Sequence, residues 1–437
     1  MKTTNEIVRT LKIKKPNPLV QLLFNFLARL LYYKRCRVSI DRRVDLKQFA
    51  KKPVIVVANH SSRMDYAFVN FAMKGRRINF VAAENEFHRS HLKTVFRWAH
   101  AIPKKNFVPD ITTVKGMAKI LKREKYGCVC IFPCGMSTAS GAQQPSACGS
   151  GKMLKHFGVD VLAVRIHGGY FVSPKFDVRE RPGKVEVEVE HLFSPQALAQ
   201  KSEEEVQRIL DDALFTDDFH WNADGRHSYK CDWGCADKLE QLLYRCPKCG
   251  GEHMHGSGDE IKCLDCGNGG VLHSNYTLHP FEGSVLPKNL RQWFDDLRRQ
   301  MRQEVLSQDF CLKGRAQIGT MPTYGYVKDK KIGDIQGEGE LTIDRQGLHF
   351  DGEREGKPFS LFIPSRLLDT LLLPVDAGFF YTYASGEFLF FLPESKSAAK
   401  WCFAAEEVHR VNGGKWQNYP WFDYSGEPAE PYAALKK

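Results

Sequence analysis

The chain has 437 residues, of which 43% are hydrophobic and 26% are charged. This composition excludes an intrinsically disordered chain, and the length allows two to four domains with at least one large core. The formal net charge of +12 favours anionic partners, namely phospholipid head groups, nucleic acid or phosphorylated substrates, and charge alone does not choose among them.

Residues 18–33 form an apolar stretch, PLVQLLFNFLARLLYY, that is too short and too polar to span a bilayer. Gln21, Asn25 and Arg29 are spaced by four, so on a helix they make one narrow polar stripe on an otherwise apolar surface. Basic residues flank the stretch on both sides. We predict that residues 1–40 are an amphipathic segment lying in the membrane interface, while a core helix packed on the next domain fits the same pattern, and both can hold at once.

The segment is followed by no small-residue cleavage site, so we expect no secretory signal peptide. The thirteen cysteines are an odd number. We therefore expect a reducing, cytoplasmic setting in which thiols are free or bound to metal, with the protein peripheral on the cytosolic face of the cell membrane.

Four apolar runs in the next part of the chain are typical of strands, and helical patterns lie between them. Such an order predicts an α/β fold, with a sheet covered by helices, over residues 41–225. The strand runs are residues 53–60, 127–135, 159–170 and 184–192, and the helical patterns are residues 65–74, 111–124, 150–157 and 202–214. Active sites in such sheets collect where strands give way to loops, which is where His60, Cys134 and His167 lie.

The stretch VVANHSSRMDY places His60 at the end of the first strand and Asp65 five residues later. If the loop curls back, Asp65 accepts a hydrogen bond from one ring nitrogen of His60, and the other nitrogen is free to take a proton from an alcohol. An Asp N-cap beside a loop histidine is the structural alternative.

Four ordered blocks resemble the 1-acylglycerol-3-phosphate acyltransferase family. They are NHSSRMD, with the family's N-H-x4-D spacing, then AIPKKNFVPD at residues 101–110, IFPCGMSTASG at residues 131–141, and VLAVRIHGGY at residues 161–170. The first block by itself is weak evidence for the family, whereas the order and spacing of all four blocks are specific to it.

The resemblance implies acyl transfer from acyl-CoA or acyl-carrier protein to the hydroxyl of a lysophospholipid such as 1-acylglycerol-3-phosphate. It assigns His60 as general base and Asp65 as the group that orients it. Lys104 and Lys105 would bind the acceptor phosphate, and Cys134 and Gly135 belong to the third, substrate-binding block.

That third block departs from the family, which has Glu where this chain has Cys134. A thiol is normally neutral and a poor hydrogen-bond acceptor. The acceptor could differ from lysophosphatidate, activity could be low, or Glu84 or Glu86 could substitute for the missing carboxylate. A nucleophilic role for Cys134 lacks an evident base, so an inert buried thiol is the simpler interpretation.

Two C-x2-C pairs follow within residues 240–275, at Cys246, Cys249, Cys263 and Cys266. Four thiolates in this spacing predict a zinc ribbon with a structural, closed Zn²⁺ site. The ribbon carries acidic as well as basic residues, so we expect no nucleic-acid partner. Cys231 and Cys235 are either a second metal pair or ordinary thiols.

The last third of the chain predicts a helical linker at residues 276–310 and a β-rich domain at residues 311–437, closed by a C-terminal helix over residues 395–413. Strands followed by one helix resemble pleckstrin-homology or GRAM domains, without a specific motif. The leading function is therefore a membrane-surface acyltransferase of phospholipid synthesis, and the alternative is a catalytically weak acyltransferase-like protein that binds lipid or a partner.

Overall fold

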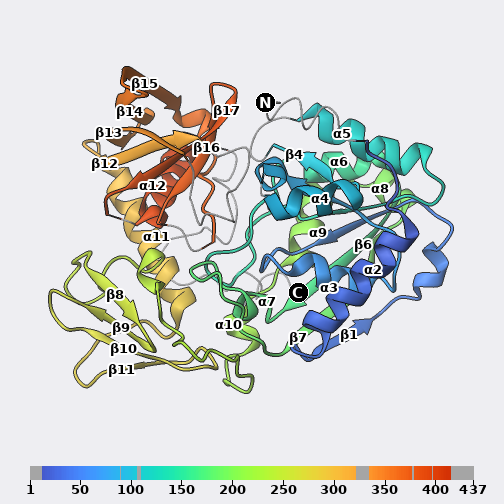
Figure 1. The fold of residues 1–437 in the computed structure, drawn as a ribbon, viewed down its shortest axis with the longest axis horizontal. Helices are drawn as coiled ribbons and strands as arrows, with labels where there is room; N and C mark the ends of the chain where they lie inside the picture. The colour runs from blue at the N-terminus through green and yellow to red at the C-terminus, as the bar shows by residue number, and fades with distance from the viewer. Residues whose placement is uncertain are drawn as a thin grey trace. The chain divides into compact units, whose positions relative to one another are not determined.

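The computed structural model describes residues 12–88, 90–105, 110–320, 334–375, 378–395 and 397–414. These residues divide into two compact units (Figure 1). Unit 1 takes the described residues of Met1–Ser173 and Arg181–Ala223, and unit 2 takes those of Pro174–Glu180, Asp224–Pro322 and Lys331–Lys437. The first eleven residues and residues 106–109, 321–333 and 415–437 carry parts of the sequence predictions and lie outside the described residues.

Unit 1 is built on a seven-stranded sheet in which the β-branched runs form the central strands. The order is β1 (Val38–Arg42), β7 (Val185–Phe193), β6 (Asp160–His167), β2 (Val54–Ala58), β5 (Cys128–Ile131), β3 (Asn79–Ala83) and β4 (Ile102–Lys104). All neighbours pair in parallel except β6 and β7, which are antiparallel. The carboxyl ends of β2, β3, β4, β5 and β6 therefore open on one edge of the sheet, where loops can bring side chains together.

Helices cover both faces of this sheet. Connections between parallel strands are right-handed, so the direction of each step along the sheet decides which face its helix covers. Helices α3 (Asp65–Ala72) and α4 (Ser90–Trp98) connect strands in one direction and lie on one face. Helices α5 (Ile111–Ala118) and α6 (Ser150–Phe157) connect strands in the opposite direction and lie on the other face. The second face carries a buried apolar cluster that includes Val57, Val129, Met117, Leu154 and Leu210. Leu210 comes from α9 (Glu203–Leu214), which begins at a capping box between Ser202 and Glu205.

Helix α2 (Pro18–Ala28) turns its polar stripe inward. Gln21 is buried, and its side-chain amide donates to Asn25 and to Asn70 of α3, at 3.1 and 2.9 Å. The apolar side chains face outward instead, and they are Leu19, Leu22, Leu23, Phe26 and Leu27, with Leu30 and Leu31 in the next turn. The helix thus docks on its own domain through polar contacts and leaves a leucine-rich face exposed. Within the described part of the chain, no helix has the length and apolar character needed to cross a bilayer.

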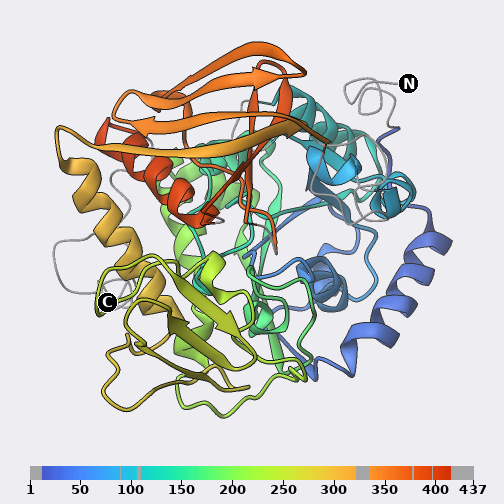
Figure 2. The same cartoon turned by 60° about the vertical axis from the view of Figure 1, so that its left-hand side comes forward.

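Unit 2 contains two antiparallel sheets. The smaller has the order β11 (Leu278–Pro280), β10 (Gly269–Leu272), β9 (Glu260–Cys263) and β8 (Met254–Ser257), and helix α11 (Leu290–Leu306) follows it. The larger sheet has the order β15 (Lys357–Pro364), β14 (Gly347–Arg354), β13 (Asp334–Asp344), β12 (Cys311–Thr320), β17 (Glu387–Pro393) and β16 (Phe380–Ala384). Helix α12 (Ala398–Val411) packs across this sheet (Figure 2).

Buried charges join α11 to α12 in unit 2. Arg298 pairs with Glu406, Arg302 and Arg410 pair with Glu407, and all but Arg302 are nearly inaccessible to solvent. Removing one partner would leave an uncompensated buried charge, which costs far more than a surface pair contributes. The mixed α/β architecture and the additional β-rich region are confirmed.

Candidate active site

His60 and Asp65 meet at the carboxyl end of β2. Nδ1 of His60 lies 2.8 Å from Oδ2 of Asp65, because the loop after β2 curls back so that α3 begins at Asp65. The imidazole stacks on Phe132 at the end of β5, with ring centroids 4.5 Å apart. About 23% of the His60 side chain is exposed, whereas only 1% of the Asp65 side chain is. With Nδ1 held by Asp65, Nε2 is the ring nitrogen that can take up a proton.

The loop itself satisfies the Asp65 carboxylate. Oδ2 also accepts the Ser62 backbone N–H at 2.9 Å, and Oδ1 accepts the hydroxyls of Ser62 and Ser61 at 2.6 and 3.3 Å. Asp65 is the first residue of α3, and Met64 holds the N-cap position. The carboxylate is therefore committed to His60 and its loop, and it does not serve as the N-cap that the sequence left open.

The backbone of His60 is fixed by a residue that the sequence analysis missed. Oε1 of Gln143 accepts the His60 N–H at 2.9 Å, and the His60 carbonyl accepts the Thr138 N–H at 2.9 Å. Gln143 is itself held by its own N–H, which donates to the Thr216 carbonyl. No local pattern marks a glutamine 83 residues away as a partner of His60, so sequence alone offers no signal for it.

Asn59 ties the same corner to the neighbouring strand. Its side-chain amide donates to the Ile166 carbonyl and to the Thr216 hydroxyl, and its oxygen accepts the Ile166 N–H, all at 2.8 Å. Asn59 is fully buried. The ends of β2 and β6 are thereby locked together directly behind the imidazole.

The third block places Cys134 in the interior and Gly135 in a tight turn. Cys134 is 2% exposed, its thiol donates to the Met136 carbonyl at 3.2 Å, and burial raises the pKa of this thiol to about 11. A neutral, buried thiol is neither an activated nucleophile nor a replacement for a carboxylate. Gly135 has φ +77°, a backbone conformation that residues with a side chain rarely adopt.

Lys104 and Lys105 lie at the carboxyl end of β4, the edge strand. Three strand spacings separate β4 from β2, which is roughly 14 Å. Nζ of Lys104 donates to the Lys105 carbonyl, and burial lowers the Lys104 pKa, an effect that the Asp110 charge opposes. The two lysines therefore lie, like His60, at the carboxyl ends of the parallel strands, but they do not contact His60.

Glu84 is a buried carboxylate at the same edge, at the carboxyl end of β3. Burial raises the Glu84 pKa, and the nearby Lys105 charge opposes that rise. Asp110 accepts the Lys105 backbone N–H at 2.9 Å. Two carboxylates and two ammonium groups thus gather at the β3–β4 end of this edge.

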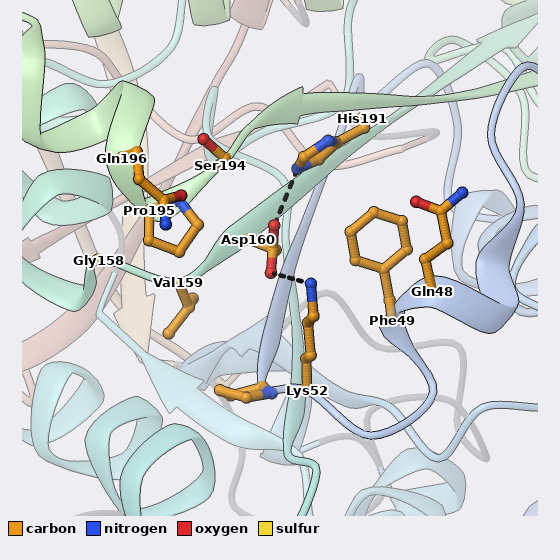
Figure 3. A pocket seen from close by; sticks show the side chains of 11 residues that line it. Gln48, Phe49, Lys52, Gly158, Val159, Asp160, His191, Ser194, Pro195 and Gln196 are labelled. Atoms are coloured by element: carbon orange, nitrogen blue, oxygen red, sulfur yellow. Dashed lines mark hydrogen bonds and ion pairs between the residues drawn. The ribbon is translucent and has the colours of Figure 1, made fainter.

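A cavity of about 410 Å³ lies at the opposite edge of the sheet, and its lining includes neither His60 nor Asp65. Figure 3 shows Asp160, at the start of β6, between His191 and Lys52, with the Phe49 ring beside them. The His191 ring and the Lys52 ammonium both already contact Asp160, and Phe49 is itself buried. This pocket therefore does not include the His60–Asp65 pair.

The four predicted zinc ligands come together in unit 2. The Sγ atoms of Cys246, Cys249, Cys263 and Cys266 all lie within 4.8 Å of one another. Gly250 and Gly267 follow the two pairs with φ +74° and +73°, which the knuckle turns require. The cluster could hold a metal ion, and its four thiolates match the ligand set of tetrahedral Zn²⁺. Cys231 instead donates its thiol to the Gly234 carbonyl at 2.8 Å.

The comparison with family models decides what this region of unit 1 is. Residues 37–167 match the model described as Acyltransferase. This part of the chain is similar to the acyltransferase family. The match ends at the last residue of β6, contains all the predicted site residues of unit 1, and spans less than a third of the chain.

The other comparisons add little to this similarity. No curated protein sequence matches the chain. Among solved structures, the chain is similar to the crystal structure of the 1-acyl-sn-glycerophosphate (LPA) acyltransferase PlsC from Thermotoga maritima. The identity is 21%, the match covers 44% of this chain and 76% of that chain, and the TM-score is 0.36, which is too distant to carry an argument.

Proposed function

We propose that the protein transfers an acyl group from acyl-CoA or acyl-carrier protein to the free hydroxyl of a lysophospholipid such as 1-acylglycerol-3-phosphate. The observation that carries this proposal is the His60–Asp65 pair, joined at 2.8 Å within the region that is similar to the acyltransferase family. The Ser61 and Ser62 hydroxyls donate to Asp65 and not to His60, so Nε2 of His60 suits a reaction whose nucleophile is a substrate hydroxyl.

In the proposed reaction, Nε2 of His60 takes the proton from the acceptor hydroxyl as its oxygen attacks the thioester carbonyl. The tetrahedral intermediate collapses with cleavage of the carbon–sulfur bond, and the departing thiolate takes the proton from the imidazolium. The products are an ester and a free thiol. Asp65 stabilises the imidazolium and keeps Nδ1 as the protonated ring position.

The acceptor phosphate is proposed to bind at the β4 end of the edge, through Lys104 and Lys105. An ammonium group binds phosphate by charge-assisted hydrogen bonds, which fix the acceptor relative to His60. Cys134 is buried, so the third block contributes to this site through the turn at Gly135 and not through the thiol.

We further propose that the protein works as a peripheral protein on the cytosolic face of the membrane. The exposed face of α2 supports this, because five large apolar side chains of that helix are 44–76% exposed while Gln21 contacts Asn70 of the same unit. Seven lysines and arginines and no acidic residue lie between residues 12 and 37, which suits anionic head groups.

The four-cysteine cluster is proposed to hold a structural Zn²⁺. Backbone N–H groups of Lys248 and Gly251 point at the sulfurs of Cys246 and Cys249, at 3.4 Å, and such donors stabilise thiolates. The predicted division of the chain, into segments 1–40, 41–225, 240–275, 276–310 and 311–437, and the pleckstrin-homology-like or GRAM-like identity of the last segment remain proposals.

A second candidate is a catalytically weak acyltransferase-like protein that binds lipid or a partner. The buried, neutral Cys134 favours it, because the carboxylate expected in the third block is missing. This candidate keeps the membrane contact and the ribbon and predicts no turnover.

One assay separates the two candidates. Radiolabelled oleoyl-CoA is incubated with a panel of lysophospholipids and one of three proteins: the natural chain, His60→Ala, or His220→Ala. His220 is an exposed histidine of unit 1 outside the matched residues 37–167. The first candidate predicts labelled diacyl product that is lost only in His60→Ala. Absence of product with the natural chain, for either oleoyl-CoA or oleoyl-acyl-carrier protein, supports the binding protein instead.

A further inference from the structure

Asp218 is a buried carboxyl group that the proposed reaction does not use, although it contacts the fourth block directly. It is the first residue of the short helix α10 (Asp218–Trp221), and none of its surface is exposed. Its Oδ1 accepts the Gly168 N–H at 2.8 Å, and its Oδ2 accepts the Tyr170 N–H at 2.9 Å. Both N–H groups lie at the start of α7 (Gly169–Val172), which lies beside α10 (Figure 1). One side chain therefore holds the turn that follows β6 with both of its oxygens.

The chain around Asp218 also holds two other blocks of the site. The Asp218 N–H donates to the Gly141 carbonyl at 3.0 Å, and the Thr216 hydroxyl accepts the Asn59 side-chain amide at 2.8 Å. The segment 216–218 lies outside the region that matches the acyltransferase model. It nevertheless contacts the first, third and fourth blocks.

The turn at the start of α7 presses against the loop that carries Asp65. A Cβ atom on Gly169 would lie 2.3 Å from the Ser61 hydroxyl oxygen, so a larger residue at this position would displace Ser61. Ser61 is buried, and its hydroxyl donates to Oδ1 of Asp65 at 3.3 Å. At the C-cap of α7, the Ser173 hydroxyl accepts the Nε–H of Arg63 at 3.1 Å. Helix α7 therefore contacts the loop between His60 and Asp65 at both of its ends.

The negative charge of Asp65 also acts on Asp218. Burial is the largest cause that raises the pKa of Asp218 to about 8, and the two backbone hydrogen bonds oppose this rise. The charges of Asp217 and Asp65 add to it. The two carboxyl groups are therefore close enough to interact, which agrees with the contacts that run from Asp218 through the turn and Ser61 to Asp65.

We propose that Asp218 is a positioning residue of the His60–Asp65 pair: it fixes the start of α7, and α7 in turn holds Ser61 and the Asp65 carboxylate in place beside the imidazole. The inference rests on the proposed function and adds to it a residue from outside the matched region. Asp218 touches no reacting atom, so its loss should lower kcat by disturbing the pair and leave the groups that bind substrate in place. A displacement of about 1 Å at a reacting group can cost on the order of 10²-fold in rate.

The kinetic test measures kcat and KM of the full-length protein for acyl transfer from radiolabelled oleoyl-CoA to 1-oleoyl-glycerol-3-phosphate. Asp218→Ala removes both acceptors, whereas Asp218→Asn keeps an oxygen for one N–H and presents to the other an amide nitrogen, which cannot accept. We expect kcat to fall by roughly 10²-fold in Asp218→Ala and by about tenfold in Asp218→Asn, with KM nearly unchanged.

Asp211→Ala and Asp211→Asn are the matched controls. Asp211 is another buried aspartate of unit 1 that accepts a backbone N–H, from Ser146 at 2.7 Å, and it contacts none of the blocks near His60. Both controls should keep the natural kcat. Circular dichroism and the thermal midpoint verify that each variant folds, and if Asp218→Ala does not fold, Asp218→Asn carries the test.

A double-mutant cycle tests whether Asp218 acts through Ser61. If it does, the losses of kcat in Asp218→Asn and Ser61→Ala do not add in the double variant, because both act on the same contact with Asp65. The effects of Asp218→Asn and Asp211→Asn should add. A general loss of stability would produce no such difference between the two pairs.

A spectroscopic measurement separates this inference from the proposed function. In protein with ¹⁵N-labelled histidine, the Nδ1–H that His60 donates to Asp65 should give a downfield proton resonance, which is assigned by its loss in His60→Ala. We expect this resonance to shift or broaden in Asp218→Asn and to stay unchanged in Asp211→Asn.

The inference and the proposed function can fail separately. If both Asp218 variants keep the natural kcat and the His60 resonance, the inference is overturned and the proposed function stands. If the natural chain has no turnover but the resonance changes only in the Asp218 variants, the proposed function fails and the positioning role stands. If KM rises while kcat is unchanged, Asp218 acts on substrate binding instead, and if the Asp211 variants lose kcat equally, the effect is a general loss of stability. Either of these last two results overturns the inference.

Discussion

Replacing Asp65 by Asn tests the charge of the proposed catalytic pair with little change in its shape. The amide oxygen can take the place of Oδ2 and keep the hydrogen bonds from His60 Nδ1 and the Ser62 N–H. The amide NH2 group then faces the Ser61 and Ser62 hydroxyls, which can rotate to accept. The substitution therefore removes one negative charge 2.8 Å from the imidazole and retains its orientation.

The expected loss of activity follows from that charge. At an effective dielectric of 20, an imidazolium about 4 Å from a carboxylate gains roughly 4 kcal/mol. Each 1.36 kcal/mol corresponds to a tenfold change in rate, so Asp65→Asn should lower kcat by up to about 10³-fold. This lies within the ~10²–10⁴-fold range of general-base catalysis.

The assay is the rate of acyl transfer from radiolabelled oleoyl-CoA to 1-oleoyl-glycerol-3-phosphate, with the thermal midpoint measured in parallel. Asp211→Asn is the matched control, because Asp211 is also a buried aspartate of unit 1 that accepts a backbone N–H, from Ser146 at 2.7 Å. The reasoning is refuted if Asp65→Asn stays within threefold of the natural kcat while His60→Ala abolishes turnover.

Three further predictions concern the third block, the cysteine cluster and a buried acid. Cys134→Glu should lower the free energy of unfolding in urea by about 1–3 kcal/mol, because a site that is 2% exposed must accept a larger, charged side chain. The control Cys134→Ser should lower the free energy of unfolding by less. A Cys134→Glu protein that gains kcat/KM without losing stability would contradict the prediction. Metal analysis should find one zinc per natural chain and per Cys231→Ser chain but none in Cys263→Ser, and equal zinc in all three proteins would place the metal elsewhere. Burial raises the pKa of Asp218 from 3.8 to about 8, so between these pH values the folded protein holds a proton that the unfolded chain has released, and the free energy of unfolding falls as pH rises. Asp218→Asn should flatten that slope in urea titrations from pH 4 to 8, and an unchanged slope would mean that Asp218 is ionised throughout.

The central strands could be predicted from sequence because their residues carry the signal locally. The β-branched runs predicted at residues 53–60, 127–135 and 159–170 contain β2, β5 and β6, and the alternation in residues 184–192 matches the alternating burial of β7. β1, β3 and β4 were missed. β4 has only three residues, including a proline, so its own sequence carries no strand pattern. It is a strand because it pairs in parallel with β3.

The site was predictable only where its members are close in sequence. His60 and Asp65 lie within one loop, so their spacing already indicated a contact. Gln143 holds the same loop from 83 residues away, through a side-chain oxygen that accepts the His60 N–H, and the Thr216 carbonyl in turn accepts the Gln143 N–H. A backbone carbonyl has no side-chain identity to read, and therefore only the fold reveals it.

The proposed acceptor end of the site depends on the chain's own charges. Nζ of Lys104 donates one of its three N–H groups to the Lys105 carbonyl, so the other two can donate to a phosphate, and hydrogen bonds from charged groups contribute about 1.5–3 kcal/mol. Burial lowers the pKa of Lys104, and an arriving phosphate opposes this effect because it favours the charged form of the amine. With a neutral thiol at position 134, Glu84 is the buried carboxylate beside Lys105 that can contact an acceptor hydroxyl or amine. We therefore expect acceptor specificity to be decided at the β3–β4 end of the sheet, by Glu84 and the lysines, and not at Cys134.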